Sequence, residues 1–210
     1  MPKAAFHKLS EEKKKIIINA ALNEFGSHSY NQSSLNNIVK FTKIPKGSFY
    51  QYFEDKFDLY KYVLNLATEE KMKFFSKEVE ESRNLNIFEL VKTLFRKGIQ
   101  FAAIHPKLAA VGNQFAKETN DEVKKEVLKF ANETGENFFV TLVESAKIKG
   151  EVNSKLNTKA CAQMFMTLNQ TVLDEMLRRY EMESLNQHKE ELYEWVDQLL
   201  DILIYGMKLN

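Results

Sequence analysis

Apolar residues recur every three or four positions along most of the chain, which is the spacing of a buried helix face. Ser10 precedes the first such run and predicts a capped helix that ends within 26–29, with apolar positions Ile16, Ile17, Ala20, Ala21 and Phe25. The same spacing predicts further helices over 34–42, 46–53, 55–80, 84 or 86 to 105, 106–117, 120–149, 158–180 and 186–207. No stretch of useful length alternates as a strand would, so the sequence predicts an all-α fold.

The second and third predicted helices are joined by a very short connection. Pro45 disfavours the helical conformation at the residue before it and suits the first turn of the helix that follows. We therefore expect a tight turn at 43–45, preceded by a helix whose inward positions include Ile38 and, as a further candidate, Phe41. Three short helices with such a turn describe a helix-turn-helix, in which the last helix enters the major groove of DNA.

The segment KIPKGSFYQYFEDKFDLY crowds five aromatic rings into the nine positions 49–57. Aromatic residues at helical spacing belong more often to a core than to a binding surface, and Phe49 and Phe53, four residues apart, are predicted to be core. Lys46 and Tyr50 share another face, beside Gly47 and Gln51. That face is predicted to meet a phosphate-bearing partner, because a tyrosine hydroxyl and a lysine can both donate to a phosphate oxygen.

The charge is unevenly distributed. Residues 1–53 carry eight lysines against three glutamates, a balance of +5, whereas the whole chain has a net charge of only +1. An anionic partner is therefore expected for the N-terminal part alone. Glutamine can pair with adenine, so Gln51 is the first candidate for a base contact, with Lys43 and Lys46 as rivals.

Other functions find little support in the composition. The four histidines are scattered without metal-ligand spacing, and no phosphate loop or nucleophile motif is present, so we predict neither a metal, a cofactor nor an enzyme. The single cysteine, Cys161, excludes an internal disulfide and indicates a reducing, cytoplasmic setting. No segment has the roughly 18 apolar residues of a membrane span.

Residues 9–60 resemble the DNA-binding domain of the TetR family of bacterial transcriptional regulators. The resemblance rests on IIINAALNEFGSHSY, on SSLNNIVKFTKIPKGSFYQYF and on EDKFDLY, and most specifically on the pattern K-G-S-F-Y-x-Y-F-x-x-K over 46–56. Lys43 stands where the family has its turn glycine, which predicts a strained or altered turn. Pro45 stands where a serine cap is usual.

The resemblance implies a helix-turn-helix domain over 1–54 and a helical regulatory and dimerisation domain over 55–210. It implies a regulator, most simply a repressor, that binds a palindromic operator as a homodimer and responds to a small molecule. The residues and the resemblance together give the candidate DNA contacts: Ser33, Ser34, Lys43, Lys46, Gly47, Ser48, Tyr50, Gln51, Tyr52 and Lys56. The alternative is a helical enzyme or a protein-binding adaptor whose basic module has no function.

Two further sites are predicted in the C-terminal part. Small and amide residues interrupt its Phe- and Met-rich helices, which favours a largely apolar cavity with a few polar groups. Its candidate lining is Phe95, Phe101, His105, Phe115, Phe138 and Asn169. The last two helices have apolar surfaces too wide for one neighbour, which predicts a two-fold, four-helix dimer interface through Leu168, Val172, Leu173, Met176, Trp195, Leu199, Ile202 and Leu203.

Overall fold

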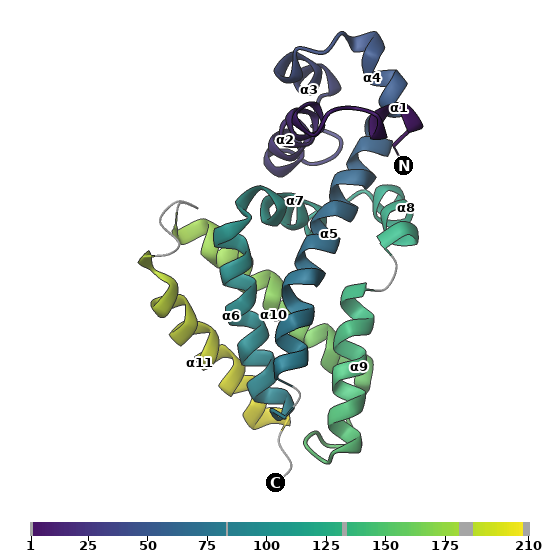
Figure 1. The fold of residues 1–210 in the computed structure, drawn as a ribbon. Helices are drawn as coiled ribbons and strands as arrows, with labels where there is room; N and C mark the ends of the chain where they lie inside the picture. The colour runs from purple at the N-terminus through teal and green to yellow at the C-terminus, as the bar shows by residue number, and fades with distance from the viewer. Residues whose placement is uncertain (1, 83, 132–133, 181–186, 208–210) are drawn as a thin grey trace. The chain divides into compact units, whose positions relative to one another are not determined.

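The computed structural model describes residues 2–82, 84–131, 134–180 and 187–207, and this part of the chain contains helices and no strand (Figure 1). The predicted all-α fold is confirmed. The helices are α1 (Ala4–His7), α2 (Glu11–Ser27), α3 (Leu35–Thr42), α4 (Lys46–Tyr52), α5 (Lys56–Glu81), α6 (Ile87–Ile104), α7 (Pro106–Ala116), α8 (Asp121–Ala131), α9 (Thr134–Ile148), α10 (Thr158–Arg179) and α11 (Lys189–Met207).

Most helix starts lie where a capping residue predicted them. Ser10 accepts from the Lys13 N–H, and Asn86 accepts from the N–H groups of Phe88 and Glu89. At the start of α5, Asp55 accepts from the Asp58 N–H at 2.7 Å, and Asp58 accepts from the N–H of Glu54, the residue before Asp55, at 3.2 Å. These contacts satisfy backbone donors that the first turn of a helix leaves unpaired.

The helix expected over 120–149 is described as α8 and α9, and residues 132–133 between them lie outside the described residues. Two other features differ from the expectation. The short helix α1 was not predicted, because only four residues form it. Phe41 was a candidate for the core but is 74% exposed. The start of the last helix, expected at 186, lies outside the described residues.

The chain divides into two compact units, an N-terminal unit of residues 1–71 and 105–132 and a C-terminal unit of residues 72–104 and 133–210. The helix α5 runs through the boundary at 71/72, and a second boundary falls between α6 and α7. The helix-turn-helix thus belongs to a unit that also contains α7 and α8. The proposed DNA-binding domain, 1–54, is a part of that unit.

Aromatic rings dominate the core of the N-terminal unit. Phe25 lies edge-on to Tyr60 at 4.9 Å between ring centroids, and Phe49 stacks on Phe53 at 5.7 Å, as the helical spacing predicted. Helix α7 packs on α2 at Gly26, where an added Cβ atom would lie 3.1 Å from the Ala110 Cβ. A larger residue at position 26 would push these two helices apart.

The C-terminal unit is built around α6. Nine of its residues are buried, among them Phe95 and Phe101, and its polar face pairs with α11. The Lys92 ammonium lies 2.7 Å from the Asp201 carboxylate, Arg96 pairs with Asp197, and the Gln100 amide donates to the Tyr193 hydroxyl. Helix α10 packs on α9, where Phe139 and Phe165 stack at 5.8 Å.

Candidate nucleic-acid interface

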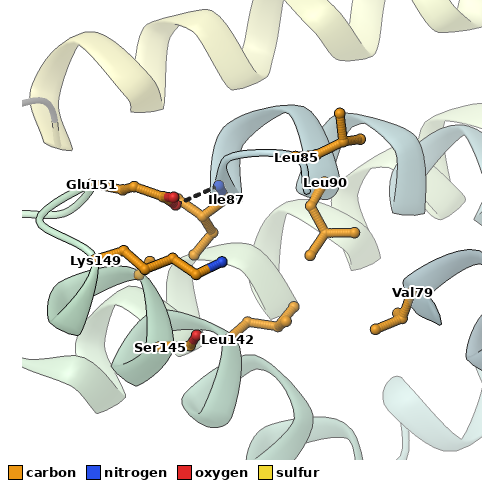
Figure 2. A pocket seen from close by; sticks show the side chains of 9 residues that line it. Val79, Leu85, Ile87, Leu90, Leu142, Ser145, Lys149 and Glu151 are labelled. Carbon is orange, nitrogen blue, oxygen red and sulfur yellow. Dashed lines mark hydrogen bonds between the residues drawn. The ribbon is translucent and has the colours of Figure 1, made fainter. Parts of the chain in front are cut away.

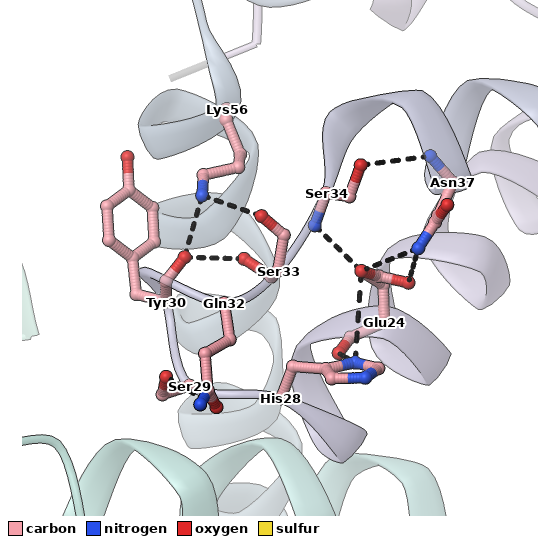
Figure 3. A network of polar contacts seen from close by, with 9 residues as sticks. All are labelled: Glu24, His28, Ser29, Tyr30, Gln32, Ser33, Ser34, Asn37 and Lys56. Carbon is pink, nitrogen blue, oxygen red and sulfur yellow. Dashed lines mark hydrogen bonds and ion pairs between the residues drawn. The ribbon is translucent and has the colours of Figure 1, made fainter.

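The start of α3 is fixed by one carboxylate of α2. Glu24 Oε1 accepts from the Ser34 N–H at 2.7 Å, and both Glu24 oxygens lie 3.3 Å from the Asn37 amide nitrogen (Figure 3). Ser34 in turn caps α3 by accepting from the Asn37 N–H at 3.4 Å. A charged acceptor at the start of a helix also complements its dipole, so Glu24 stabilises the start of α3 next to α2.

A lysine ammonium holds the loop between α2 and α3. Lys56, in the first turn of α5, donates to the carbonyl oxygens of Tyr30 at 2.7 Å and Ser33 at 2.9 Å, and its ammonium lies 4.2 Å from the centre of the Tyr30 ring (Figure 3). Burial lowers the pKa of this lysine, and the charge of Glu24 opposes that effect. A lysine in the first turn of a helix is unfavourable, because it lies at the positive end of the helix dipole. The contacts with the loop give Lys56 a structural reason for this position, which sequence reasoning missed.

A buried carboxylate ties the same loop to the end of α7. Glu118 is 3% exposed, and its Oε2 accepts from the Tyr30 N–H at 3.1 Å. Its Oε1 accepts from the N–H groups of Thr119 and Asn120, both at 3.0 Å. The loop before α3 is thus held by α5 and α7 at once, and both contacts lie within the N-terminal unit.

The turn between α3 and α4 keeps a left-handed residue although no glycine is present. Lys43 has φ 55° and ψ 19°, a conformation that raises the energy of a non-glycine residue by roughly 1–2 kcal/mol. The Thr42 hydroxyl supports the turn by donating to the Val39 carbonyl and accepting from the Ile44 N–H. The turn is therefore strained, which is one of the two outcomes expected where a lysine replaces the turn glycine.

Helix α4 presents a polar face to solvent. Lys46, Gly47 and Gln51 are exposed, as is Lys43 before them, and Tyr50 is 45% exposed. Within the described residues the side chains of Lys43, Lys46 and Gln51 make no hydrogen bond or ion pair. No atom lies within 4 Å of a Cβ built on Gly47, so packing does not require glycine there.

The other predicted DNA contacts are more covered. Ser33 is 6% exposed and its hydroxyl donates to the Tyr30 carbonyl, so this side chain is engaged inside the protein. Ser34 and Ser48 are half-buried, and Tyr52 leans edge-on against Phe6 at 6.5 Å. The DNA contacts of these residues remain predictions. Ser33 and Ser34 would contribute by fixing the backbone before α3, because their hydroxyls are engaged inside the protein.

The N-terminal arm reaches the far end of α4, which sequence reasoning missed. Phe6 is 1% exposed and lies 4.9 Å from the Phe53 ring and 5.4 Å from the Tyr62 ring, measured between centroids. Lys3 donates from its backbone N–H to the Tyr52 carbonyl and from its ammonium to the Tyr50 carbonyl. A cation at the carboxyl end of a helix is favourable, so the arm stabilises α4. Phe6, the one phenylalanine before Ser10, was the available signal.

The candidate ligand residues fall in both units. Phe95 and Phe101 are each 3% exposed and belong to the C-terminal unit, as do half-buried Phe138 and Asn169. His105 and half-buried Phe115 belong to the N-terminal unit. The lining of a ligand site by these six residues remains a prediction.

The candidate dimer residues differ in exposure. Val172 and Met176 are buried within the protomer, at 4% and 1% exposure, whereas Ile202 is 70% exposed. Leu168, Leu173, Trp195, Leu199 and Leu203 are half-buried, and Arg179 stacks on the Trp195 ring. A largely apolar groove runs beside Ile202, lined by Leu156, Asn157, Ala160, Cys161, Met164 and Leu203.

Neither a metal centre nor a membrane span emerges from the described residues. No group of three or more histidine, cysteine, aspartate or glutamate side chains in this part of the chain is placed to hold a metal ion. None of the helices in it has both the length and the apolar character needed to cross a bilayer.

Comparisons with known proteins match this geometry. The family described as "Bacterial regulatory proteins, tetR family" matches residues 17–63, which span α3 and α4. A solved TetR family transcriptional regulator from Chloroflexus aurantiacus J-10-FL has 27% sequence identity and a TM-score of 0.80, with 100% of both chains covered. The HTH-type transcriptional repressor BepR of Brucella suis biovar 1 (strain 1330) is 24% identical over 177 residues, which are 79% of this chain and 81% of BepR.

A third relative is similar in fold alone. It is the transcriptional regulator FadR from Bacillus subtilis, solved in complex with stearoyl-CoA, with 20% identity, a TM-score of 0.63 and coverage of 87% of this chain and 97% of that one. Taken together, the helix-turn-helix and the match over 17–63 identify a DNA-binding domain of the TetR family of bacterial transcriptional regulators, and the chain as a whole is similar to a solved regulator of that family.

Proposed function

We propose that the protein is a repressor that binds a palindromic operator as a homodimer and leaves it when a small, largely apolar ligand binds. The observation that carries the DNA-binding part is the exposed face of α4. The side chains of Lys43, Lys46 and Gln51 have no partner within the described residues, and Gly47 weakens the helix without any packing reason. A duplex phosphate backbone lying close to Gly47 accounts for both features.

Three features support the ligand part. BepR is by name a repressor, and FadR was solved with stearoyl-CoA, a ligand with a long apolar chain. Phe- and Met-rich helices make up the C-terminal unit, which has no basic surplus of its own with which to hold DNA. Helix α5 passes through both units, and its first turn carries Lys56, which holds the loop before α3.

The coupling that this mechanism requires is modest. Half-sites in DNA lie about 34–36 Å apart, so a small change in the spacing of two α4 helices impairs simultaneous binding. A hundredfold loss of DNA affinity needs a preference of only about 2.7 kcal/mol for the state that cannot bind DNA. A tilt of α5 is the simplest route for that change.

The test is fluorescence anisotropy with the full chain and the DNA that flanks its own gene. We expect a palindrome there to bind more tightly than unrelated DNA, and the logarithm of the affinity should fall linearly with the logarithm of the salt concentration.

Gln51→Ala should relax the preference at one base pair of each half-site. Apolar compounds that raise the melting temperature should release the DNA. Equal affinity for all DNA would contradict the repressor, and tight apolar ligands that leave the operator bound would contradict the ligand part.

Gly47→Ala is expected to have opposite effects on stability and on operator binding. The free energy of unfolding should rise by about 0.5–1 kcal/mol, because alanine is the better helix former and the added methyl group meets no protein atom. Operator affinity should fall, because the methyl group occupies the space next to the duplex. Gly112→Ala on α7 is the matched control, since that site is also open: it should stabilise equally and leave DNA binding unchanged. Unchanged affinity in Gly47→Ala would show that DNA does not approach this position.

Ile202→Asp is expected to convert the dimer into a monomer. Ile202 is 70% exposed beside the groove of α10 and α11, so the charge should not disturb the folded protomer but should be costly inside an apolar interface. Light scattering should give twice the chain mass of 24.5 kDa for the wild type and the mass of one chain for the variant. Ile148→Asp, at an 88% exposed position on α9, is the control and should remain dimeric. A monomeric wild type would rule out the homodimer.

A further inference from the structure

A second pocket lies inside the C-terminal unit, and none of its lining residues is among the six candidate ligand residues predicted from the sequence. It has a volume of about 160 Å³ and lies among the end of α5, the start of α6 and the end of α9. Its walls are apolar, formed by Val79, Leu85, Ile87, Leu90, Leu142 and Ala146, and Ser145, Lys149 and Glu151 are its polar lining residues. Figure 2 shows Lys149 and Glu151 on one side and Val79 on the opposite side.

The size of this pocket suits a single ring or a short chain. An apolar cavity of about 150 Å³ is known to bind benzene, because water gains little from filling such a space. Ile87 and Leu90 are buried, whereas Leu85, Ser145 and Lys149 are exposed at the rim. A ligand can therefore place its apolar part against the buried walls and keep a polar group at the rim. A long acyl chain does not fit in this volume.

The charge available at the rim is positive. The Lys149 ammonium makes no hydrogen bond or ion pair with any described residue, whereas Lys147, two positions earlier, donates to the Leu156 carbonyl and the Thr158 hydroxyl. In Figure 2 the Lys149 side chain extends toward the interior of the pocket. The Ser145 hydroxyl likewise has no hydrogen bond within this part of the chain.

The one acid of the pocket is already engaged. Glu151 Oε2 accepts from the Ile87 N–H at 2.8 Å, so its negative charge faces the positive end of the α6 dipole. The Asn86 side-chain oxygen accepts from the next two N–H groups of α6, those of Phe88 and Glu89. The helix end therefore offers no anion site, and Lys149 with Ser145 remain as the free donors.

We propose that this pocket binds a small aromatic or short-chain carboxylate, with the apolar part between Ile87, Leu90 and Leu142 and the carboxylate on the Lys149 ammonium and the Ser145 hydroxyl. The binding itself does not depend on the function proposed above. Its role as an effector site does, because it would act by weakening operator binding.

The test is isothermal titration calorimetry of the full chain with benzoate and, as its uncharged counterpart, benzyl alcohol. Benzoate should bind the wild type more tightly than benzyl alcohol. Lys149→Met should weaken benzoate binding about tenfold, as expected for a charge-assisted hydrogen bond, and leave benzyl alcohol unchanged. Lys159→Met, at an exposed lysine of α10, is the control and should bind both compounds as the wild type does. Ser145→Phe should block both compounds by filling the mouth of the pocket.

Three results would overturn the site: no heat of binding for benzoate at millimolar concentration, equal affinity for benzoate and benzyl alcohol, or wild-type benzoate affinity in Lys149→Met. Operator binding is measured separately, in the same protein with and without benzoate. Benzoate that binds through Lys149 while the operator stays bound supports the site and contradicts its effector role. Failure to find any operator would contradict the repressor and leave the calorimetric result intact.

Discussion

Glu118→Ala is expected to lower the free energy of unfolding by about 3–5 kcal/mol and to weaken operator binding. The carboxylate is 3% exposed and accepts from three backbone N–H groups, of Tyr30, Thr119 and Asn120. Hydrogen bonds to a charged group contribute about 1.5–3 kcal/mol each, and removal of the acceptor leaves three partly buried N–H groups without it. Since Tyr30 belongs to the loop before α3, the loss should also release the start of that helix.

Two variants separate this effect from a mere change of charge. Glu118→Gln retains one carbonyl oxygen and should lose less stability than the alanine variant. Glu122→Ala removes an exposed acid from the first turn of α8 and should change the free energy of unfolding by no more than about 0.5 kcal/mol. Urea unfolding followed by circular dichroism measures all three. Wild-type stability in Glu118→Ala would show that the loop does not depend on this carboxylate.

The helices were predictable because their signals are local. Ser10, Asp55 and Asn120 each precede a helix at the position where a side-chain oxygen can accept the first free N–H groups, and each does so in the structure. The exposed face of α4 was predictable for a similar reason. In a helix whose rings Phe49 and Phe53 point inward, Lys46 and Tyr50 must lie on another face.

The contacts that position α3 and α4 were not predictable in the same way. Glu118 and Tyr30 are 88 residues apart, and Lys56 bonds backbone carbonyls whose places depend on the path of a loop. The spacing of apolar residues along the sequence carries no information about either contact. Phe41 shows the opposite error, since its apolar side chain suggested the core although it is 74% exposed.

Lys56→Met is expected to reduce both stability and operator affinity. The variant keeps the apolar stem and loses the ammonium, so the Ser33 carbonyl loses this donor and the Tyr30 carbonyl keeps only the Ser33 hydroxyl. The free energy of unfolding should fall by about 2 kcal/mol, the contribution of charge-assisted hydrogen bonds that are only partly shielded from water. An ammonium has three donors, and two of them point to these carbonyls, so one remains for a phosphate oxygen.

The salt dependence of operator binding distinguishes the two roles of Lys56. Each lost phosphate contact reduces the slope of log affinity against log salt by about 0.9, and a dimer loses two such contacts. Lys46→Met is the matched control, because Lys46 is exposed and unpaired within the described residues: it should reduce the slope in the same way and leave stability unchanged. If Lys56→Met lowers stability but keeps the wild-type slope, Lys56 only positions the loop. If it keeps both stability and slope, the contacts of its ammonium with Tyr30 and Ser33 contribute to neither property, and both roles are wrong.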